Sequence, residues 1–217
     1  MKDDHIDAVI RNLQEEIKSL GIPVVTEVSR DRSPFKVLIS CILSLRTKDE
    51  VTRDASKRLF RLAETPNDML KLDQKTIEKT IYPVGFYITK AKNIIGISKT
   101  LVEKYNSIVP QDIDELLKLK GVGRKTANLV VTLGYKKLGI CVDTHVHRIS
   151  NRLGYVSTKT PKETEFSLRG KLPKKYWIIY NDLLVTYGQN ICKPISPFCS
   201  KCKIEKYCDK VDVNKSR

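Results

Sequence analysis

The chain has 217 residues, of which 41% are hydrophobic and 30% charged, and its 40 basic side chains against 25 acidic ones give a net charge of +15. A chain of this length can bury roughly 70% of its unfolded surface, so this composition excludes a disordered protein and predicts a globular one. No apolar run approaches the roughly 18 residues of a membrane span, and the acidic, helically periodic start is unlike a secretory or transit signal.

We therefore expect a soluble intracellular protein, in the cytoplasm or nucleoid if its source is prokaryotic. A charge of +15 exceeds what solubility needs and indicates a polyanionic partner. Nucleic acid is favoured over a membrane surface because the sequence contains no long basic amphipathic helix.

Helical periodicity dominates the chain from end to end. The expected helices span residues 6–20, 34–45, 50–60, 67–72, 74–81, 88–105, 112–120, 125–135, 144–154 and 176–188. Residues 21–28 read as a linker or a short extended crossing. Ser33 is an expected N-cap, although periodicity alone does not exclude a strand after it, and Asp49 is another expected cap. No convincing strand periodicity or fixed repeat is present, so the predicted fold class is all-α.

The stretch "KGVGRKTANLVV" (120–131) predicts a helix–hairpin–helix turn at about residues 119–124. Gly121 and Gly123 bracket Val122, which we expect to point inward, and glycine lets another backbone approach closely. The amides at the start of the following helix suit a phosphate oxygen, and Lys120 and Arg124 add positive charge. An ordinary helix corner also uses glycine, but the charge of the chain favours a DNA-backbone contact.

Lys125 follows in the first turn of the second helix, where the helix dipole disfavours a cation by about 0.3–1 kcal/mol. Such a position suits a lysine that must be neutral to act as a nucleophile. Neutralising it at pH 7 costs roughly 4–5 kcal/mol, which the dipole, neighbouring cations and desolvation would have to supply. A plain phosphate contact by Lys125 remains open from these residues alone.

Six cysteines fall into two groups. Cys41 and Cys141 lie in apolar runs and are expected to be buried thiols. The other four form a C-x6-C-x2-C-x5-C pattern: Cys192, Cys199, Cys202 and Cys208. Disulfides fit an intracellular chain poorly, so this spacing predicts a metal centre, with an iron–sulfur cluster only weakly preferred to zinc. Lysines at positions 193, 201, 203 and 206 would give this loop a positive surface.

The motifs "GFYITKAKNI", "LKGVGRKTAN" and "VDTHVHR", with the cysteine tail, together resemble the endonuclease III family of DNA glycosylases. The resemblance spans essentially the whole chain and implies two helical domains flanking a DNA cleft. One would be a six-helix barrel over residues 27–137. The other would join residues 1–26 to residues 138–217 and contain a [4Fe–4S] loop at residues 192–208.

Several site residues are implied by this resemblance alone. Lys125 matches the Schiff-base lysine, Asp143 the catalytic aspartate, and the four tail cysteines the cluster ligands. Arg46 and Phe86 match positions that fill the duplex where the damaged base leaves. From its own context, Asp143 reads as a helix N-cap, which is compatible with catalysis. His145 is expected to be a packed or surface histidine and is not assigned a catalytic role.

The implied activity is that of a bifunctional DNA N-glycosylase and abasic-site lyase in base excision repair. Acting as a monomer on duplex DNA that contains damaged bases or abasic sites, it would remove oxidised pyrimidines and nick the strand by β-elimination. The alternatives are a non-catalytic DNA-binding module with a metal scaffold, a structural zinc protein, and a mismatch-specific glycosylase. Mismatch-specific relatives lack the lysine found at position 125.

The sequence departs from the family pattern at two DNA-facing positions. Lys120 replaces the usual hairpin proline and adds a possible phosphate contact. Arg46 stands where relatives often carry glutamine, and arginine only donates hydrogen bonds whereas glutamine also accepts them. We therefore expect a preference for guanine opposite the lesion, because arginine suits its O6 and N7 acceptors.

Overall fold

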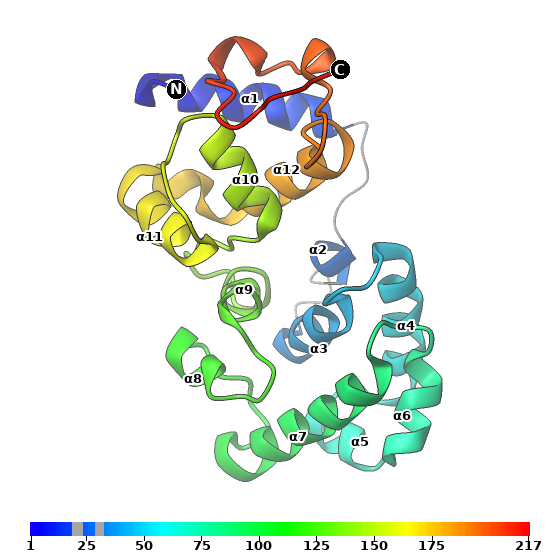
Figure 1. Cartoon of the computed structure of the whole chain (residues 1–217). Coiled ribbons are helices and arrows are strands. Elements are labelled where there is room, and N and C mark those ends of the chain that lie inside the picture. Colours follow the sequence, from blue (N-terminus) through cyan, green and yellow to red (C-terminus); the bar gives the residue numbers. More distant parts are fainter. Residues whose placement is uncertain (19–23, 29–32) are drawn as a thin grey trace. The chain divides into compact units, whose positions relative to one another are not determined.

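A computed structural model describes residues 1–18, 24–28 and 33–217. Every regular element in these ranges is a helix, which confirms the predicted all-α class (Figure 1). No helix in the described part of the chain is long and apolar enough to cross a membrane. The chain forms two compact units, one of Met1–Pro23 with Ile140–Arg217 and the other of Val24–Gly139.

The Val24–Gly139 unit is a succession of helices ending at the glycine turn and the segment after it. They are α2 (Val24–Val28), α3 (Pro34–Ser44), α4 (Asp49–Leu62), α5 (Pro66–Leu70), α6 (Gln74–Ile81), α7 (Tyr87–Tyr105), α8 (Ile113–Leu117), α9 (Arg124–Leu129) and the π-helical turn η3 (Val130–Gly134). In Figure 1, α5 and α6 lie along α7, and both contact it.

Helix α3 is the central helix of this unit. Its N-cap Ser33 accepts a hydrogen bond from the backbone N–H of Lys36 (3.2 Å), and Pro34 is its first residue, as predicted. All residues from Val37 to Leu43 are buried, and α3 packs against α4, α7, α9 and η3. The strand alternative for this stretch is therefore wrong, because a helix surrounded by helices is apolar on every side.

Three local predictions need correction. Val24–Val28 is a helix, so the extended alternative is wrong there, while residues 21–23 lie outside the described ranges. Helix α4 begins at Asp49 with Lys48 in the cap position, so Asp49 stabilises the helix by its charge in the first turn and not as the cap. The first helix of the chain ends at Ile17, and residues 19 and 20 are outside the described part.

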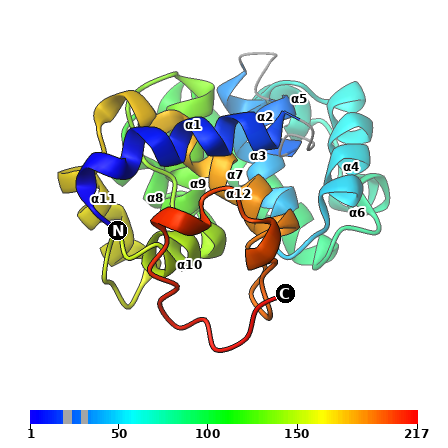
Figure 2. The same ribbon diagram turned by 90° about the horizontal axis from the view of Figure 1, so that it is seen from above.

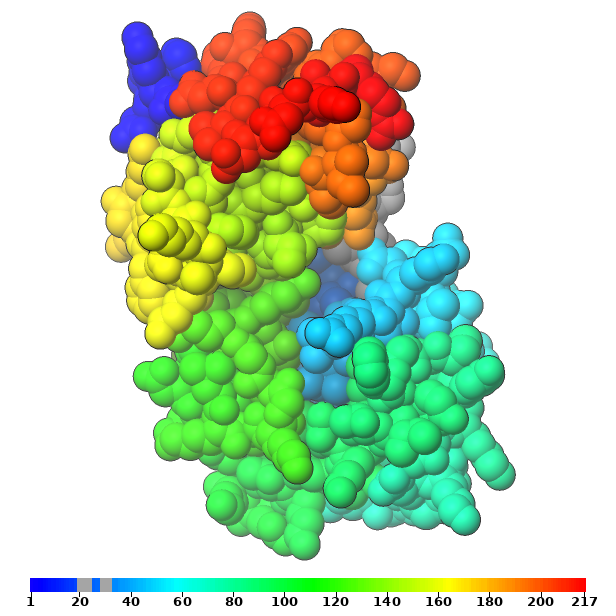
Figure 3. Space-filling view, viewed as in Figure 1, coloured from blue at the N-terminus to red at the C-terminus, as the bar shows by residue number. Residues whose placement is uncertain are grey.

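The other unit contains both chain ends. Its elements are η1 (Asp3–His5), α1 (Ile6–Ile17), α10 (Thr144–Arg152), α11 (Pro161–Lys171), η4 (Lys174–Tyr176), α12 (Trp177–Asn190), η5 (Cys199–Lys201) and η6 (Glu205–Tyr207). Helix α12 contacts both α1 and α10, and their apolar faces share one core (Figures 1 and 2). The chain after Asn190, orange to red in Figure 3, forms part of the surface of this unit.

Helix α11 was not expected from the sequence, although its start carries a clear signal. Thr160 is the N-cap, and its hydroxyl accepts from the backbone N–H of Glu163 (3.2 Å). The Glu163 carboxylate in turn accepts from the backbone N–H of Lys159 (2.9 Å), and Pro161 occupies the first helical position. The pattern resembles a capping box, with the Glu163 carboxylate bound to the N–H one residue before the cap. The helix was not predicted because the stretch after this start is charged and only weakly periodic.

Candidate active site and cysteine cavity

The glycine turn joins α8 to α9 as predicted. Gly121 has φ +84°, and a Cβ on it would lie 2.9 Å from Nδ2 of Asn93 in α7, so the turn and α7 require a residue without a side chain here. Val122 is buried beneath the turn. Gly123 is the N-cap of α9 at φ −99°, and open space lies where its Cβ would be. Glycine at this position therefore leaves room for a ligand to approach the backbone.

Lys125 is the second residue of α9 and is exposed. Helix α9 packs on α3, whose Cys41 thiol is buried. Burial raises the pKa of Cys41 to about 12, and the positive charge of Lys125 acts on it in the opposite direction. Lys125 thus lies at an exposed helix start, and its charge acts on the buried Cys41 thiol in α3.

Asp143 is the N-cap of α10, as its sequence context predicted. Its Oδ1 accepts hydrogen bonds from the backbone N–H groups of His145 and Val146, each at 2.9 Å. The residue is buried, with an exposed fraction of 9%. Two backbone donors and the positive end of the helix dipole stabilise a carboxylate at this position.

His145 is a packed histidine, in agreement with the sequence-based reading. Its Nδ1 lies 3.1 Å from the guanidinium of Arg148. A Cβ on Gly188 in α12 would lie 2.4 Å from the same ring nitrogen, so glycine at 188 allows α10 and α12 to approach closely.

Arg46 and Phe86 come together on the surface of the Val24–Gly139 unit. The guanidinium carbon of Arg46 lies 5.7 Å from the centroid of the Phe86 ring, a cation–π distance. Both side chains are exposed, Phe86 by 62%. Both residues also have left-handed backbones, with φ of 52° and 58°. The structure therefore presents an aromatic ring and a guanidinium side by side on two adjoining turns.

The four tail cysteines line one cavity, together with residues of α10, α12 and the chain that follows. Hydrogen-bond donors point at three of the sulfurs: Tyr187 Oη at Cys202 (3.2 Å), the Arg152 guanidinium at Cys192 (3.5 Å) and the Lys210 N–H at Cys208 (3.4 Å). All six cysteines of the chain are free thiols. Among the described residues, no three His, Cys, Asp or Glu side chains are gathered closely enough to hold a single metal ion.

Two arginines of α10 tie the cysteine loop to this helix, a role that sequence reasoning missed. Arg148 donates to the carbonyl of Cys192 (2.7 Å). Arg152 donates to the carbonyls of Lys193 and Pro194, each at 2.7 Å. Helix α10 therefore has Asp143 at one end and the wall of the cysteine cavity at the other.

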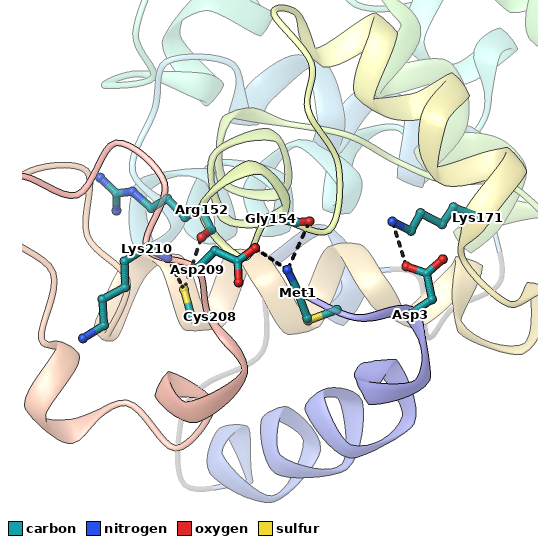
Figure 4. A network of polar contacts seen from close by, with 8 residues as sticks. All are labelled: Met1, Asp3, Arg152, Gly154, Lys171, Cys208, Asp209 and Lys210. Atoms are coloured by element: carbon teal, nitrogen blue, oxygen red, sulfur yellow. Dashed lines mark hydrogen bonds and ion pairs between the residues drawn. The ribbon is translucent and has the colours of Figure 1, made fainter.

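Figure 4 shows further contacts beside this cavity. The Sγ of Cys208 donates to the carbonyl of Arg152 (3.3 Å), and the neighbouring Asp209 carboxylate pairs with the amino group of Met1. These contacts join the loop to the first residues of the chain. Sequence reasoning did not find them because they link positions more than 50 residues apart.

The positive surface expected for the cysteine loop is only partly available. Lys203 forms an ion pair with Glu16 (2.8 Å), so its charge is largely compensated. The ammonium groups of Lys193 and Lys201 instead lie 5.7 and 5.9 Å from the centroid of the Phe198 ring. These two lysines are the better candidates of the loop for contact with an anion.

The comparisons with known proteins agree with this arrangement. Residues 39–174 match the model of the HhH-GPD superfamily base excision DNA repair protein. Endonuclease III of Thermotoga maritima is 49% identical over 180 residues, which cover 83% of this chain and 84% of that protein. Endonuclease III of Bacillus subtilis is 39% identical over 177 residues, which cover 81% of each chain.

Among solved structures, a trapped covalent intermediate of an endonuclease III with DNA superimposes with a TM-score of 0.85. The match covers 97% of each chain at 34% identity. On the family model, the sequence identities and the shared fold, the chain belongs to the endonuclease III family of base excision DNA repair glycosylases.

Proposed function

We propose that this DNA glycosylase is bifunctional, and that it excises oxidised pyrimidines from duplex DNA and then nicks the strand. The observation that carries the proposal is Lys125, an exposed lysine in the first turn of α9, directly after the glycine turn. A relative 34% identical to this chain has been trapped as a covalent intermediate with DNA, which supports a nucleophilic role for a side chain of the shared fold.

The proposed reaction begins when the neutral amine of Lys125 attacks C1′ of the damaged nucleotide. The glycosidic bond breaks, its electron pair leaves with the base, and the attacking nitrogen loses a proton. The sugar ring then opens, with the electron pair going to its ring oxygen, and C1′ and nitrogen form a Schiff base. This makes the C2′ proton acidic, and its removal expels the 3′ phosphate by β-elimination.

Asp143 is proposed to stabilise the positive charge that develops on the sugar. Its cap hydrogen bonds fix the orientation of the carboxylate. Proton removal from Lys125 is assigned to water or the substrate. Asp143 thus acts by electrostatic stabilisation, for which a preorganised carboxylate is suited.

A base inside a duplex must leave the stack before this chemistry, at a cost of a few kcal/mol. We propose that Phe86 and Arg46 offset this cost by entering the space that the base leaves, because both are exposed side by side. Backbone contact at Gly121 and Gly123, with Lys120 and Arg124 on phosphates, would hold the strand meanwhile.

The four tail cysteines are proposed to hold a [4Fe–4S] cluster. Four thiols around one cavity are the donor set of such a cluster, and hydrogen-bond donors point at the sulfurs of Cys192, Cys202 and Cys208. The group, when bound, would cross-link a loop of little regular structure. Cys199→Ser is then expected to remove the broad visible absorbance near 400 nm of the purified protein. Retention of full absorbance in that variant would exclude Cys199 as a ligand.

We also propose that the two compact units are the two domains expected from the sequence. The boundaries expected at residues 27 and 137 lie near those of the Val24–Gly139 unit. This assignment can be tested by limited proteolysis, which should cut near the two junctions and release residues 24–139 as one resistant fragment.

The activity is tested on a duplex that carries one 5,6-dihydroxythymine, an oxidised pyrimidine. The expected products are the free base and a strand nicked with an unsaturated aldehyde at its 3′ end. Lys125→Ala is expected to release neither, while Lys99→Ala, which removes an exposed lysine of α7, serves as the control. Base release without nicking by the parent would identify a monofunctional enzyme instead.

A further inference from the structure

Helix α7 contains a lysine whose ammonium group lies inside the protein. Lys90 is only 5% exposed. Its Nζ donates to the carbonyl of Leu43 at 2.7 Å, to the carbonyl of Leu45 at 2.5 Å, and to the hydroxyl of Thr47 at 3.0 Å. An ammonium has three donors, so this group is fully used, and its acceptors lie in the last turn of α3 and in the segment that follows it.

The segment that Lys90 holds includes Arg46, which lies between Leu45 and Thr47. Arg46 has φ of 52°, a backbone conformation that costs a residue with a side chain on the order of 1–3 kcal/mol. Such a conformation persists only when surrounding contacts fix it. The bonds from Lys90 to Leu45 and Thr47 supply those contacts from both sides of Arg46.

The same contacts reach the turn that carries Phe86. The Thr47 hydroxyl also accepts from the backbone N–H of Gly85 at 3.2 Å. A Cβ on Gly85 would lie only 2.7 Å from the carbonyl oxygen of Arg46, so the two turns are in direct backbone contact. Phe86, itself at φ 58°, follows immediately, and its carbonyl accepts from the backbone N–H of Lys90 at 3.0 Å.

Burying the charge of Lys90 to hold two turns together costs free energy of desolvation. Apolar residues of similar volume commonly stabilise a core as well as a buried charge or better. Consistent with this cost, burial lowers the pKa of Lys90 to about 8. Lys90 is therefore better explained by the geometry that it fixes than by a gain in stability.

We propose that Lys90 is a positioning residue for base extrusion, holding Arg46 and Phe86 in the paired arrangement that enters the duplex. This inference rests on the role proposed above for those two side chains. Lys90 does not touch DNA, since it is buried, and it acts through the turns at residues 45–47 and 85–86. Its effect is therefore confined to steps in which a base has to leave the stack.

The test compares Lys90→Met with Lys92→Met, which removes the same charge from an exposed position two residues away on α7. Single-turnover rates are measured on a duplex with a paired 5,6-dihydroxythymine and on a duplex with a preformed abasic site. Lys90→Met is expected to slow excision about 10-fold or more but nicking of the abasic site less than about 3-fold, because no base has to be extruded there. Lys92→Met is not expected to slow excision selectively relative to nicking of the abasic site.

Phe86→Ala and the double variant separate positioning from simple destabilisation. If Lys90 acts through Phe86, the double variant excises no more slowly than the slower single variant. An effect of the double variant equal to the product of both single effects, or an equal loss at the abasic site, would overturn the positioning role. Unchanged excision by Phe86→Ala would instead refute the proposed entry of Phe86 into the duplex, whatever Lys90→Met does.

A second variant covers the case in which Lys90→Met does not fold. Thr47→Val removes the hydroxyl that joins Lys90 to Gly85, and Thr47→Ser keeps it. Thr47→Val should reproduce the selective loss of excision, and Thr47→Ser should restore the parent rate. Equal rates for these two variants would contradict the proposal.

Discussion

The guanidinium carbon of Arg46 lies 5.7 Å from the ring centroid of Phe86, on the surface of the Val24–Gly139 unit. The ring holds the guanidinium by a cation–π contact of about 0.5–1 kcal/mol at an exposed site. In the proposed entry into the duplex, Arg46 would present an oriented group of donors to the base opposite the lesion.

We predict that this orientation favours guanine opposite the lesion. Arginine donates to the O6 and N7 acceptors of guanine, and a good bidentate pair contributes about 1–3 kcal/mol of discrimination. Excision of one lesion opposite each of the four bases should be fastest opposite guanine. In Arg46→Gln the preference should weaken, because glutamine both donates and accepts. Equal rates for the parent, or faster excision opposite adenine, would refute this prediction.

Asp143 allows its structural and chemical roles to be separated. Asparagine is as good an N-cap as aspartate, so Asp143→Asn should keep the hydrogen bonds to His145 and Val146 and leave the thermal midpoint almost unchanged. It removes the carboxylate charge, and excision should fall about 100-fold or more.

Asp143→Ala should lose both functions, with a loss of about 1 kcal/mol in unfolding free energy as well as activity. Thermal unfolding and single-turnover excision measured on both variants distinguish these cases. If Asp143→Asn excises at the parent rate, the residue is a cap and nothing more.

The two hairpin glycines should respond differently to alanine. At Gly121 the new Cβ would meet Asn93 at 2.9 Å and the backbone has φ +84°, so Gly121→Ala should destabilise the protein by about 1–2 kcal/mol. Gly123 has ordinary φ and open space, so Gly123→Ala should change the unfolding free energy by less than about 1 kcal/mol.

Gly123→Ala should nevertheless weaken DNA binding, because its methyl group occupies the space through which a phosphate would approach. Chemical denaturation and binding to an undamaged duplex at two salt concentrations measure the two effects. Undiminished DNA affinity in Gly123→Ala would place the phosphate contact elsewhere.

The depressed pKa of Lys90 predicts a pH-dependent contribution to stability. The folded protein releases this proton near pH 8, whereas the unfolded chain keeps it up to the ordinary value of 10.5. Between these values the unfolded state binds more protons, so the contribution of Lys90 to the unfolding free energy rises with pH, by at most about 1.4 kcal/mol per unit.

Lys90→Met lacks this titration. The unfolding free energy of the parent minus that of the variant should therefore increase between pH 7.5 and 9.5. A difference that stays level, or falls, over this range would show that the pKa of Lys90 is not depressed in the folded state.

The parts of the site that depend on neighbouring residues could be predicted from the sequence. Lys125 follows a glycine turn, Asp143 precedes an apolar helical pattern, and the four tail cysteines lie within one short segment. Such features are local, and local spacing determines which face or end of a helix a residue occupies. The all-α class follows from the same periodicity.

Contacts between distant segments could not be predicted in the same way. The approach of Gly121 to Asn93, the clamp of Lys90 on Leu43 and Leu45, and the hold of Arg152 on the cysteine loop each join parts that only the fold brings together. Each contact either provides a hydrogen bond for a polar group or depends on two backbones lying close together. Neither requirement produces a pattern in the sequence of one segment alone.

The central claim is that Lys125 is a nucleophile, and borohydride trapping tests it most directly. The parent and Lys125→Ala are incubated with borohydride and a duplex carrying one oxidised pyrimidine, and in parallel with an abasic-site duplex. The account predicts a covalent protein–DNA adduct with the parent on both duplexes and with the variant on neither. No adduct from the parent on either duplex, despite tight and salt-sensitive binding, would contradict it and leave Lys125 a phosphate contact.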